Sequence, residues 1–302
     1  MRCWPRATNS RQAWVSDWRA LDAATLEREY NARATVPDID AELRAYRDGS
    51  TPMYQRRPHR RGLRYGPGAD ETLDLFPVPG RPDAPLFLFI HGGYWRALCK
   101  EDSVFMAQNF TTLGVAVAAI DYSLAPAAHL SLMVDQCRRA VAWLHQQGGG
   151  LGVNTDRMVV AGSSAGAHLA AMVLASGWQA GFDLPDEAVS GGVLVSGLYD
   201  LAPLRHALPQ NWLRLRESDV QALSPQQHLP DPARRLQIVV AQQDTGEFKR
   251  QSRDYASACE AIGCPMTFYE VEGRNHFDVI LDWTRPDSEL TRSVLHLLQT
   301  DR

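Results

Sequence analysis

Residues 158–166, Met-Val-Val-Ala-Gly-Ser-Ser-Ala-Gly, are the stretch that decides the fold of this chain. An apolar run leads into Gly-x-Ser-x-Gly, with Ser164 at its centre, and a helix-like run follows. This order predicts a strand, a sharp turn and a helix. A nucleophilic serine at such a turn has a strained backbone, so only small residues fit two positions to either side, where this chain has Gly162 and Gly166. Because an ordinary glycine-serine turn has the same pattern, the assignment depends on other stretches.

The length and composition are those of an ordinary globular protein. The 302 residues can bury a large core, and we expect residues 1–302 to form a single domain. Hydrophobic residues make up 45% and charged residues 22%, and the formal net charge is −4. A net negative charge argues against a nucleic-acid binder that depends on a basic surface. The arginines within residues 56–64 form a local basic cluster, which we interpret as a solvated face or as partners of carboxylates.

The cysteine pattern and the N-terminus indicate the compartment. Five scattered cysteines show neither a Cys-x-x-Cys spacing nor a metal-ligand spacing, which is typical of free thiols in a reducing compartment. The first residues lack the apolar stretch of a signal peptide, and the later apolar runs are too short to cross a bilayer. We therefore expect a cytoplasmic, soluble protein with no membrane partner. The cysteines are Cys3, Cys99, Cys137, Cys259 and Cys264.

Strand patterns follow a helical N-terminal part. Residues 1–60 mix Leu, Ala, Glu and Arg evenly, which predicts a helical arm that packs through residues including Trp4, Trp14 and Trp18. From Glu71 to Pro77 apolar and polar residues alternate, which predicts a half-buried edge strand. Continuous apolar runs then predict central strands that are covered on both faces. These runs are Leu86–Ile90, Val115–Ile120, Met158–Ala161, Val193–Val195, Leu236–Ala241 and Met266–Val271.

Helical stripes separate the strands. Apolar residues recur at helical spacing within residues 133–144, 255–262 and 290–297. Strands that alternate with helices predict an α/β fold with a mostly parallel central sheet and helices on both faces. The glycine-rich residues 148–152 match neither a dinucleotide fingerprint nor a phosphate-binding loop, so we interpret them as a helix stop and turn.

Residues 201–230 interrupt this alternation. The segment contains several prolines and lies between two predicted strands at the active-site end of the sheet. We interpret it as a small helical, cap-like insertion. Such insertions usually shape substrate choice, and we expect Trp212 to contact the substrate.

The sequence His91-Gly92-Gly93-Tyr94-Trp95 directly follows a predicted buried strand. Two glycines at this place let the backbone bend so that N–H groups point into a cleft. We predict that the N–H groups of Gly93, Tyr94 and Ala165, the residue after Ser164, hold a developing oxyanion. His91 is interpreted as structural, with its ring bonded to the backbone.

A histidine and a carboxylate complete the pattern. His276 lies just past the last predicted strand, where a serine hydrolase places its general base. Asp244 follows the preceding strand and is predicted to orient His276, with Glu247 as the alternative acid. The sequence order Ser, Asp, His is that of the α/β-hydrolase fold. His168, one turn after Ser164, is interpreted as a packing residue.

We expect neither a metal nor a cofactor, because no group of His, Cys, Asp and Glu has metal-ligand spacing. The expected partner is a small-molecule substrate, with no nucleic acid, and the prediction allows for a homodimer.

Several motifs together resemble the arylformamidase (kynurenine formamidase) branch of the α/β-hydrolases. The resemblance runs from about Leu26 to the C-terminus. The His-Gly-Gly-Tyr-Trp stretch is fairly specific, since related lipases and esterases more often have a third glycine there. The motifs are His91–Trp95, Gly162–Gly166, Glu247–Ser252, Asn275–Asp278, Tyr30-Asn31, Asp121-Tyr122, Leu124–Pro126 and Ser196–Asp200.

The resemblance implies hydrolysis of N-formyl-kynurenine to kynurenine and formate through a formyl-enzyme at Ser164. It also implies that Tyr94 and Trp95 narrow the acyl pocket and offer an aromatic wall to the substrate ring. The chain departs from the family in having Ser163 where members often have His, Ala167 where they have Gly, and Asp244 where they often have Glu.

Two other functions are consistent with the sequence. A carboxylesterase that acts on small acyl or aryl esters would use the same residues. A ligand-binding protein that has lost catalysis usually lacks one member of the triad, whereas Ser164, Asp244 and His276 are all present here.

Overall fold

The computed structural model describes residues 17–299, so Cys3, Trp4 and Trp14 lie outside the described residues. Within this range eight strands form one sheet in the order β1-β2-β4-β3-β5-β6-β7-β8. From β4 to β8 neighbouring strands are parallel, and β2 pairs antiparallel with both β1 and β4. The predicted α/β class with a mostly parallel sheet is confirmed. The strands are β1 (Arg60–Arg64), β2 (Thr72–Phe76), β3 (Ala84–Ile90), β4 (Ala116–Ile120), β5 (Val153–Ser163), β6 (Gly191–Val195), β7 (Arg235–Ala241) and β8 (Met266–Val271).

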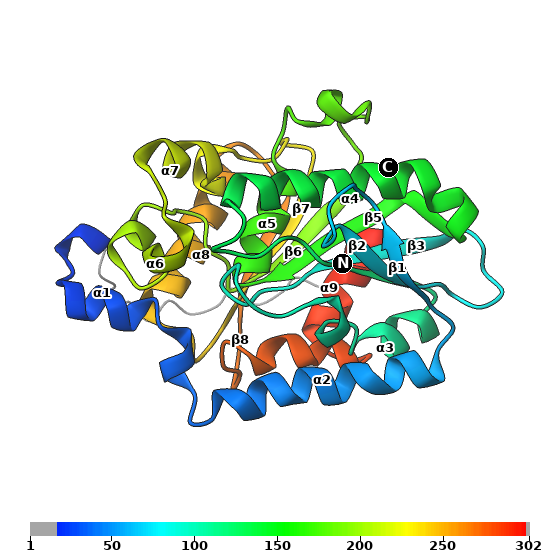
Figure 1. Cartoon of the computed structure of the whole chain (residues 1–302), viewed down its shortest axis with the longest axis horizontal. Helices are drawn as coiled ribbons and strands as arrows, with labels where there is room; N and C mark the ends of the chain where they lie inside the picture. Colours follow the sequence, from blue (N-terminus) through cyan, green and yellow to red (C-terminus); the bar gives the residue numbers. More distant parts are fainter. Residues whose placement is uncertain (1–16, 300–302) are drawn as a thin grey trace, which may run out of the picture.

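Helices cover both faces of this sheet, as the layers in Figure 1 show. Along β3, Leu86, Leu88 and Ile90 face a core shared with α4, α5 and α8, whereas Phe87 and Phe89 face a core shared with α2, α3 and α9. All seven residues of β3 are buried, which explains why this strand is a continuous apolar run. The helices are α1 (Ala23–Glu29), α2 (Ile39–Arg56), α3 (Ala107–Thr112), α4 (Leu130–Leu151), α5 (Ala165–Leu174), α6 (Gln210–Leu213), α7 (Glu217–Leu223), α8 (Gly246–Ala261) and α9 (Glu289–Gln299).

The N-terminal arm is built from α1, α2 and short 3-10 helices, η1 (Trp18–Ala20) and η2 (Ala32–Thr35). Aspartates fix both helix starts: Asp22 accepts from the N–H of Thr25 at 2.7 Å, and Asp38 accepts from the N–H of Ala41 at 3.0 Å. Leu26 of α1 packs into the core on the α8 side of the sheet, and α2 runs along the opposite face (Figure 1). The arm therefore crosses the rim of the sheet between the two faces.

Between β6 and β7 the chain forms a run of short helices. It includes η5 (Pro203–His206), α6, α7 and η6 (Pro225–Gln227), and its residues Trp212 and Leu223 join the core on the α5 side. In Figure 1, α6 lies beside α1 at one end of the molecule, and α7 lies beyond α6. The insertion and the N-terminal arm thus meet at the same end.

Some strand predictions were wrong. Residues 72–76 are not an edge strand, because β1 pairs with β2 on its outer side. β1 itself, within the arginine-rich stretch, was not predicted, since four of its five residues are exposed and only Leu63 is apolar and half-buried. β8 is the opposite edge and is only partly buried, so it is not covered on both faces.

The glycine-rich residues 148–152 also differ in detail from the prediction. The helix α4 continues through Gly148, Gly149 and Gly150 and ends at Leu151. Gly152 then has φ of 78°, a left-handed conformation that commonly ends a helix.

No helix of the described residues is long and apolar enough to cross a membrane.

Candidate active site

Ser164 lies at the sharp turn between β5 and α5. Its φ of 56° and ψ of −120° are strained for a residue with a side chain. The turn is tightly packed: a Cβ on Gly162 would lie 2.2 Å from the carbonyl oxygen of Gly166 in α5, and one on Gly166 would lie 2.1 Å from that of Ile90 at the end of the neighbouring β3. Only glycine fits at either position, as the motif predicts.

Hydrogen bonds hold this turn in place. The N–H of Ser164 donates to the carbonyl of Val195 at the end of β6 (2.8 Å). The carbonyl of Ser164 accepts the N–H groups of Ala167 and His168, which begins the helix. Ala165 is therefore the first residue of α5, and its N–H lies at the positive end of the helix dipole.

His276 and Asp244 meet beside this turn. The Nδ1 of His276 is 2.6 Å from Oδ1 of Asp244. A carboxylate only accepts hydrogen bonds, so Nδ1 carries the hydrogen and Nε2 of the neutral ring is free to take a proton. The other oxygen of Asp244 accepts from the Ser196 hydroxyl at 2.5 Å and from the N–H of Ala241 at 2.9 Å. The oxygen of Asp244 that does not contact His276 therefore accepts two hydrogen bonds, and these hold the carboxylate in place.

Glu247 has different partners. Its carboxylate accepts from the hydroxyl of Tyr30 at 2.7 Å and pairs with Arg250 at 2.8 Å. This geometry assigns Glu247 to a contact between α8 and the N-terminal arm, and Asp244 is the carboxylate that His276 contacts. The contacts therefore favour Asp244 over Glu247, which is on the first turn of α8 and contacts the arm.

The loop after β3 has an unusual backbone. Gly93, Tyr94 and Trp95 follow one another with φ of 88°, 53° and 58°. His91 anchors the start of the loop: its Nδ1 lies 3.1 Å from the carbonyl of Gly92, and its ring stacks on Tyr122 with centroids 4.4 Å apart. Burial lowers the pKa of His91 to about 4, so its ring stays neutral at physiological pH. These contacts agree with a structural role for His91.

The loop brings backbone N–H groups to the serine. In the described part of the chain, the N–H groups of Gly93, Tyr94 and Ala165 donate to no carbonyl or side chain. Gly93 and Tyr94 line the same pocket as Ser164, and Ala165 follows it directly. Unpaired N–H groups beside a serine are what an oxyanion requires.

Trp95 does not line the pocket, so its predicted role as a substrate wall is wrong. Its side chain is fully buried, and its ring packs edge-on against His168 at 5.1 Å. The positive φ of Tyr94 and Trp95 turns the indole behind the loop, toward α5. His168 in turn lies 2.8 Å through Nε2 from the carbonyl of Leu223, which supports its interpretation as a packing residue.

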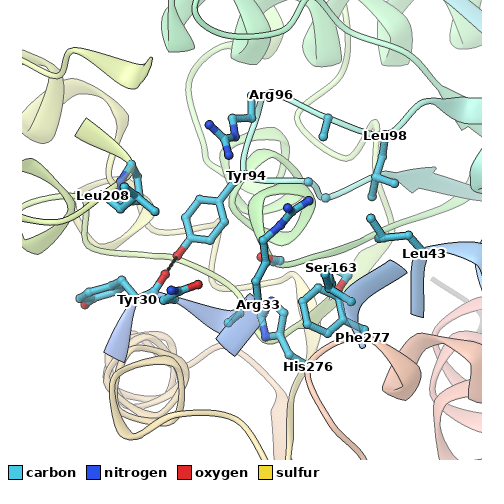
Figure 2. Close-up of a pocket in the computed structure, with 18 of the residues that line it drawn as sticks. Tyr30, Arg33, Leu43, Tyr94, Arg96, Leu98, Ser163, Leu208, His276 and Phe277 are labelled. Carbon is cyan, nitrogen blue, oxygen red and sulfur yellow. Dashed lines mark hydrogen bonds between the residues drawn. The ribbon is translucent and has the colours of Figure 1, made fainter. Parts of the chain in front are cut away.

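The pocket above Ser164 is closed by three separate parts of the chain (Figure 2). The loop after β3, the insertion and the N-terminal arm each contribute, together with the segment after His276. The lining residues are Tyr30, Asn31, Ala32, Arg33, Ile39, Leu43, Tyr46, Gly92, Gly93, Tyr94, Arg96, Ala97, Leu98, Ser163, Ser164, Leu208, Pro209, Trp212, His276, Phe277 and Ile280. Ser164 and His276 therefore face one cavity.

Hydrogen bonds connect these three parts around Tyr94. The hydroxyl of Tyr94 donates to the carbonyl of Tyr30 at 2.5 Å, drawn as a dashed line in Figure 2. The Nε1 of Trp212 donates to the carbonyl of Tyr94 at 2.9 Å, and the two rings meet edge-on. Trp212 therefore does line the pocket, at the junction of insertion and loop.

The arm supplies pocket residues that sequence reasoning did not select. The sequence predicts Tyr30 only as a packing residue of the arm and as part of a motif of the resemblance. Ser196, which follows β6 and donates to Asp244, is likewise predicted only as part of such a motif. No sequence pattern around Arg33 and Leu43 indicates that they lie at the site, because more than 100 residues separate each of them from Ser164.

The fold and the elbow define the class of protein: an α/β hydrolase with a serine at the strand-to-helix turn. A family model described as BD-FAE matches residues 73–191. A protein from Danio rerio named kynurenine formamidase is 32% identical over 296 residues, which cover 94% of this chain and 99% of that protein. The chain belongs to the kynurenine formamidase family of hydrolases.

Two further proteins show the breadth of the similarity. The Mycobacterium tuberculosis protein named esterase LipQ is 29% identical over 253 residues, covering 74% of this chain and 59% of that protein. A crystal structure of a Silicibacter protein has a TM-score of 0.76 and 26% identity, covering 89% of this chain and 98% of that one.

Proposed function

We propose that the chain hydrolyses N-formyl arylamines, with N-formyl-kynurenine as the first candidate, through a triad of Ser164, His276 and Asp244. The observation that carries the proposal is the 2.6 Å contact between Asp244 and His276, which lines the same pocket as Ser164. The family relatives that match almost the whole chain supply the substrate class, since they are named for this reaction.

The proposed reaction has two steps. The Ser164 hydroxyl attacks the formyl carbon while Nε2 of His276 takes its proton, and the N–H groups of Gly93, Tyr94 and Ala165 hold the resulting oxyanion. The carbon–nitrogen bond then breaks, and the arylamine leaves with the proton from His276. This leaves a formyl ester on Ser164.

Water completes the cycle. His276 takes a proton from the attacking water, the ester bond to Ser164 breaks, and the serine oxygen recovers that proton as formate leaves. Asp244 stabilises the imidazolium that forms twice in each turnover.

The shape of the pocket supports an aromatic leaving group. Tyr94, Trp212 and Phe277 line the cavity around Ser164 and offer ring faces and edges to an aryl group. The loop after β3 also packs closely on the elbow, since a Cβ on Gly92 would lie 2.7 Å from the carbonyl oxygen of Ser163 and 3.5 Å from the Cβ of Ser164. We propose that an acyl group larger than formyl meets this loop.

The second candidate is a carboxylesterase, which the similarity to an esterase favours. Kinetics on N-formyl-kynurenine and its N-acetyl analogue, beside nitrophenyl acetate and butyrate, separate the two. A formamidase should turn over the formyl compound well and lose at least about 100-fold in kcat/KM with acetyl, because the larger group meets the loop. Butyrate esters cleaved as well as or better than the formamide would assign the chain to the esterases.

We further propose a cytoplasmic location. The four described cysteines, Cys99, Cys137, Cys259 and Cys264, are free thiols, which suits a reducing compartment. Fractionation of the source cells tests this, and activity recovered in a secreted fraction would contradict it.

A further inference from the structure

The charges that line the Ser164 pocket are unbalanced. Arg33 and Arg96 line it, and within residues 17–299 no aspartate or glutamate does. The chain as a whole carries 35 acidic residues and 31 lysines and arginines, so a pocket with two cations and no acid is opposite in sign to the net charge of the chain. A cavity lined by one sign of charge attracts ligands of the other sign.

Arg33 extends into this cavity from the N-terminal arm. In Figure 2 its side chain leaves η2 and reaches into the space bordered by Tyr94, Leu98 and His276. Its guanidinium makes no ion pair or hydrogen bond with any other described residue. Arg33 is thus a donor without a carboxylate partner at the mouth of the active site.

Arg96 is held in place on the other side of the cavity. Its guanidinium carbon lies 3.9 Å from the ring centroid of Trp212, in cation–π contact. Trp212 is itself fixed by its hydrogen bond to the carbonyl of Tyr94. The stacking orients the guanidinium but uses none of its N–H donors, which remain available to a planar carboxylate.

Two glutamates of α1 have other partners. Glu27 accepts the N–H of Leu208 at 2.8 Å, and Glu29 accepts the N–H of Glu247 at 3.0 Å. Neither lines the pocket, so neither neutralises Arg33 or Arg96 there.

We infer that the pocket selects aryl substrates that carry a carboxylate on the leaving-group side, which Arg33 and Arg96 bind. The acyl group lies at Ser164 and Gly93, so the leaving group extends toward the arm and the insertion, where both arginines are placed. This inference rests on the proposed hydrolysis at Ser164 and names the residues that determine its specificity.

Two substrates that differ only in the charge of one group test this inference. One is the deamino analogue of N-formyl-kynurenine, whose single charge is its carboxylate, and the other is the same compound with a carboxamide in that place. The ratio of their kcat/KM values should be about tenfold or more in favour of the carboxylate. Arg33→Gln and Arg96→Gln should each lower this ratio several-fold, mainly through KM, and added salt should lower it in the wild type.

The matched control is Arg47→Gln. Arg47 is an exposed arginine on α2 that does not line the pocket, so its loss changes the net charge by the same amount. The ratio should keep its wild-type value in this variant. A ratio near one in the wild type, or an equal fall in all three variants, would overturn the inference.

The same comparison is made with acetoxy analogues of both compounds and by calorimetric binding to Ser164→Ala. If only the esters are cleaved but the carboxylate is still preferred, formamide hydrolysis fails and the inference stands. If formamides are cleaved without preference, the inference fails alone. Equal affinity of Ser164→Ala for carboxylate and carboxamide overturns it without any need for turnover.

Discussion

The hydroxyl of Tyr94 donates a hydrogen bond to the backbone carbonyl of Tyr30 at 2.5 Å. This bond links the loop that carries the proposed oxyanion donors to the N-terminal arm. Tyr30 in turn donates its own hydroxyl hydrogen to Glu247 and accepts a hydrogen bond from Gln251 on α8 (2.8 Å). The wall of the pocket, the arm and the helix that follows Asp244 therefore form one connected unit. The arm therefore helps to line the candidate active site.

These two tyrosines should differ in their effect on stability. Tyr94→Phe removes one hydrogen bond and should lower the free energy of unfolding by about 1 kcal/mol. Tyr30→Phe keeps the carbonyl that Tyr94 uses but removes one hydrogen bond each from buried Glu247 and Gln251, which retain their contacts with Arg250 and Asp200, and this should cost about 1–3 kcal/mol. Urea unfolding measures both. A Tyr30→Phe variant as stable as the wild type would contradict the buried network.

The acid of the triad can be identified by two matched amide variants. Asp244→Asn should lower kcat by about 10³–10⁴-fold, because His276 loses the carboxylate that fixes its tautomer. Glu247→Gln weakens the contact between α8 and the arm and should lower kcat by less than about tenfold. Steady-state kinetics of both variants on the preferred substrate measure the two effects. A larger loss of kcat in Glu247→Gln than in Asp244→Asn would identify Glu247 as the acid of the triad.

The parts of the fold that sequence predicted are those that short stretches determine. The run from Met158 to Gly166 contains its own strand, turn and helix start, and the close contact of Gly162 with the carbonyl of Gly166 is a local consequence of the turn. Buried central strands such as β3 are apolar on both faces and can be recognised without knowledge of their neighbours. The order of Ser164, Asp244 and His276 then followed from the order of the strands.

The rest depends on contacts between distant parts of the chain. β1 is an exposed edge strand with arginines at most positions, so it has no apolar pattern to detect. The direction of Trp95 depends on the positive φ of two successive non-glycine residues, which no propensity indicates. Arg33 reaches the pocket only because the arm folds across the rim of the sheet, and that path is determined by tertiary packing.

Replacing glycine by alanine should destabilise the fold at Gly166 and stabilise it at Gly149. Gly166→Ala places a Cβ 2.1 Å from the backbone oxygen of Ile90, which cannot move without disturbing β3, so it should destabilise by at least about 3 kcal/mol. Gly149→Ala, in the exposed part of α4 with nothing within 4 Å of the new Cβ, should stabilise by about 0.5–1 kcal/mol. Thermal unfolding of both variants tests this pair. A harmless Gly166→Ala would mean that the elbow is looser than the structure shows.

Buried neutral histidines should make stability depend on pH. Burial lowers the pKa of both His91 and His168 to about 4 from 6.5, so between these values the unfolded chain binds more protons. Their contribution is fully present above about pH 6.5 and is lost as the pH falls toward 4. As the pH falls from 7 to 5, each histidine should lower the free energy of unfolding by about 2 kcal/mol.

His168→Gln isolates one of these contributions. Glutamine keeps a donor for the carbonyl of Leu223 but does not titrate, so the variant should lose about 2 kcal/mol less than the wild type between pH 7 and pH 5. Urea unfolding at the two pH values gives the difference. Equal losses in variant and wild type would show that His168 is not held neutral by burial.

The central claim is that Ser164 is a nucleophile activated by His276, and covalent labelling tests it most directly. A fluorophosphonate should add to the wild-type chain once, and peptide mass spectrometry should locate the adduct on Ser164. His276→Ala should react at least about 100-fold more slowly, and Ser164→Ala should not react at this peptide. An unlabelled Ser164 in the folded wild-type protein, or equal labelling rates with and without His276, would contradict the account.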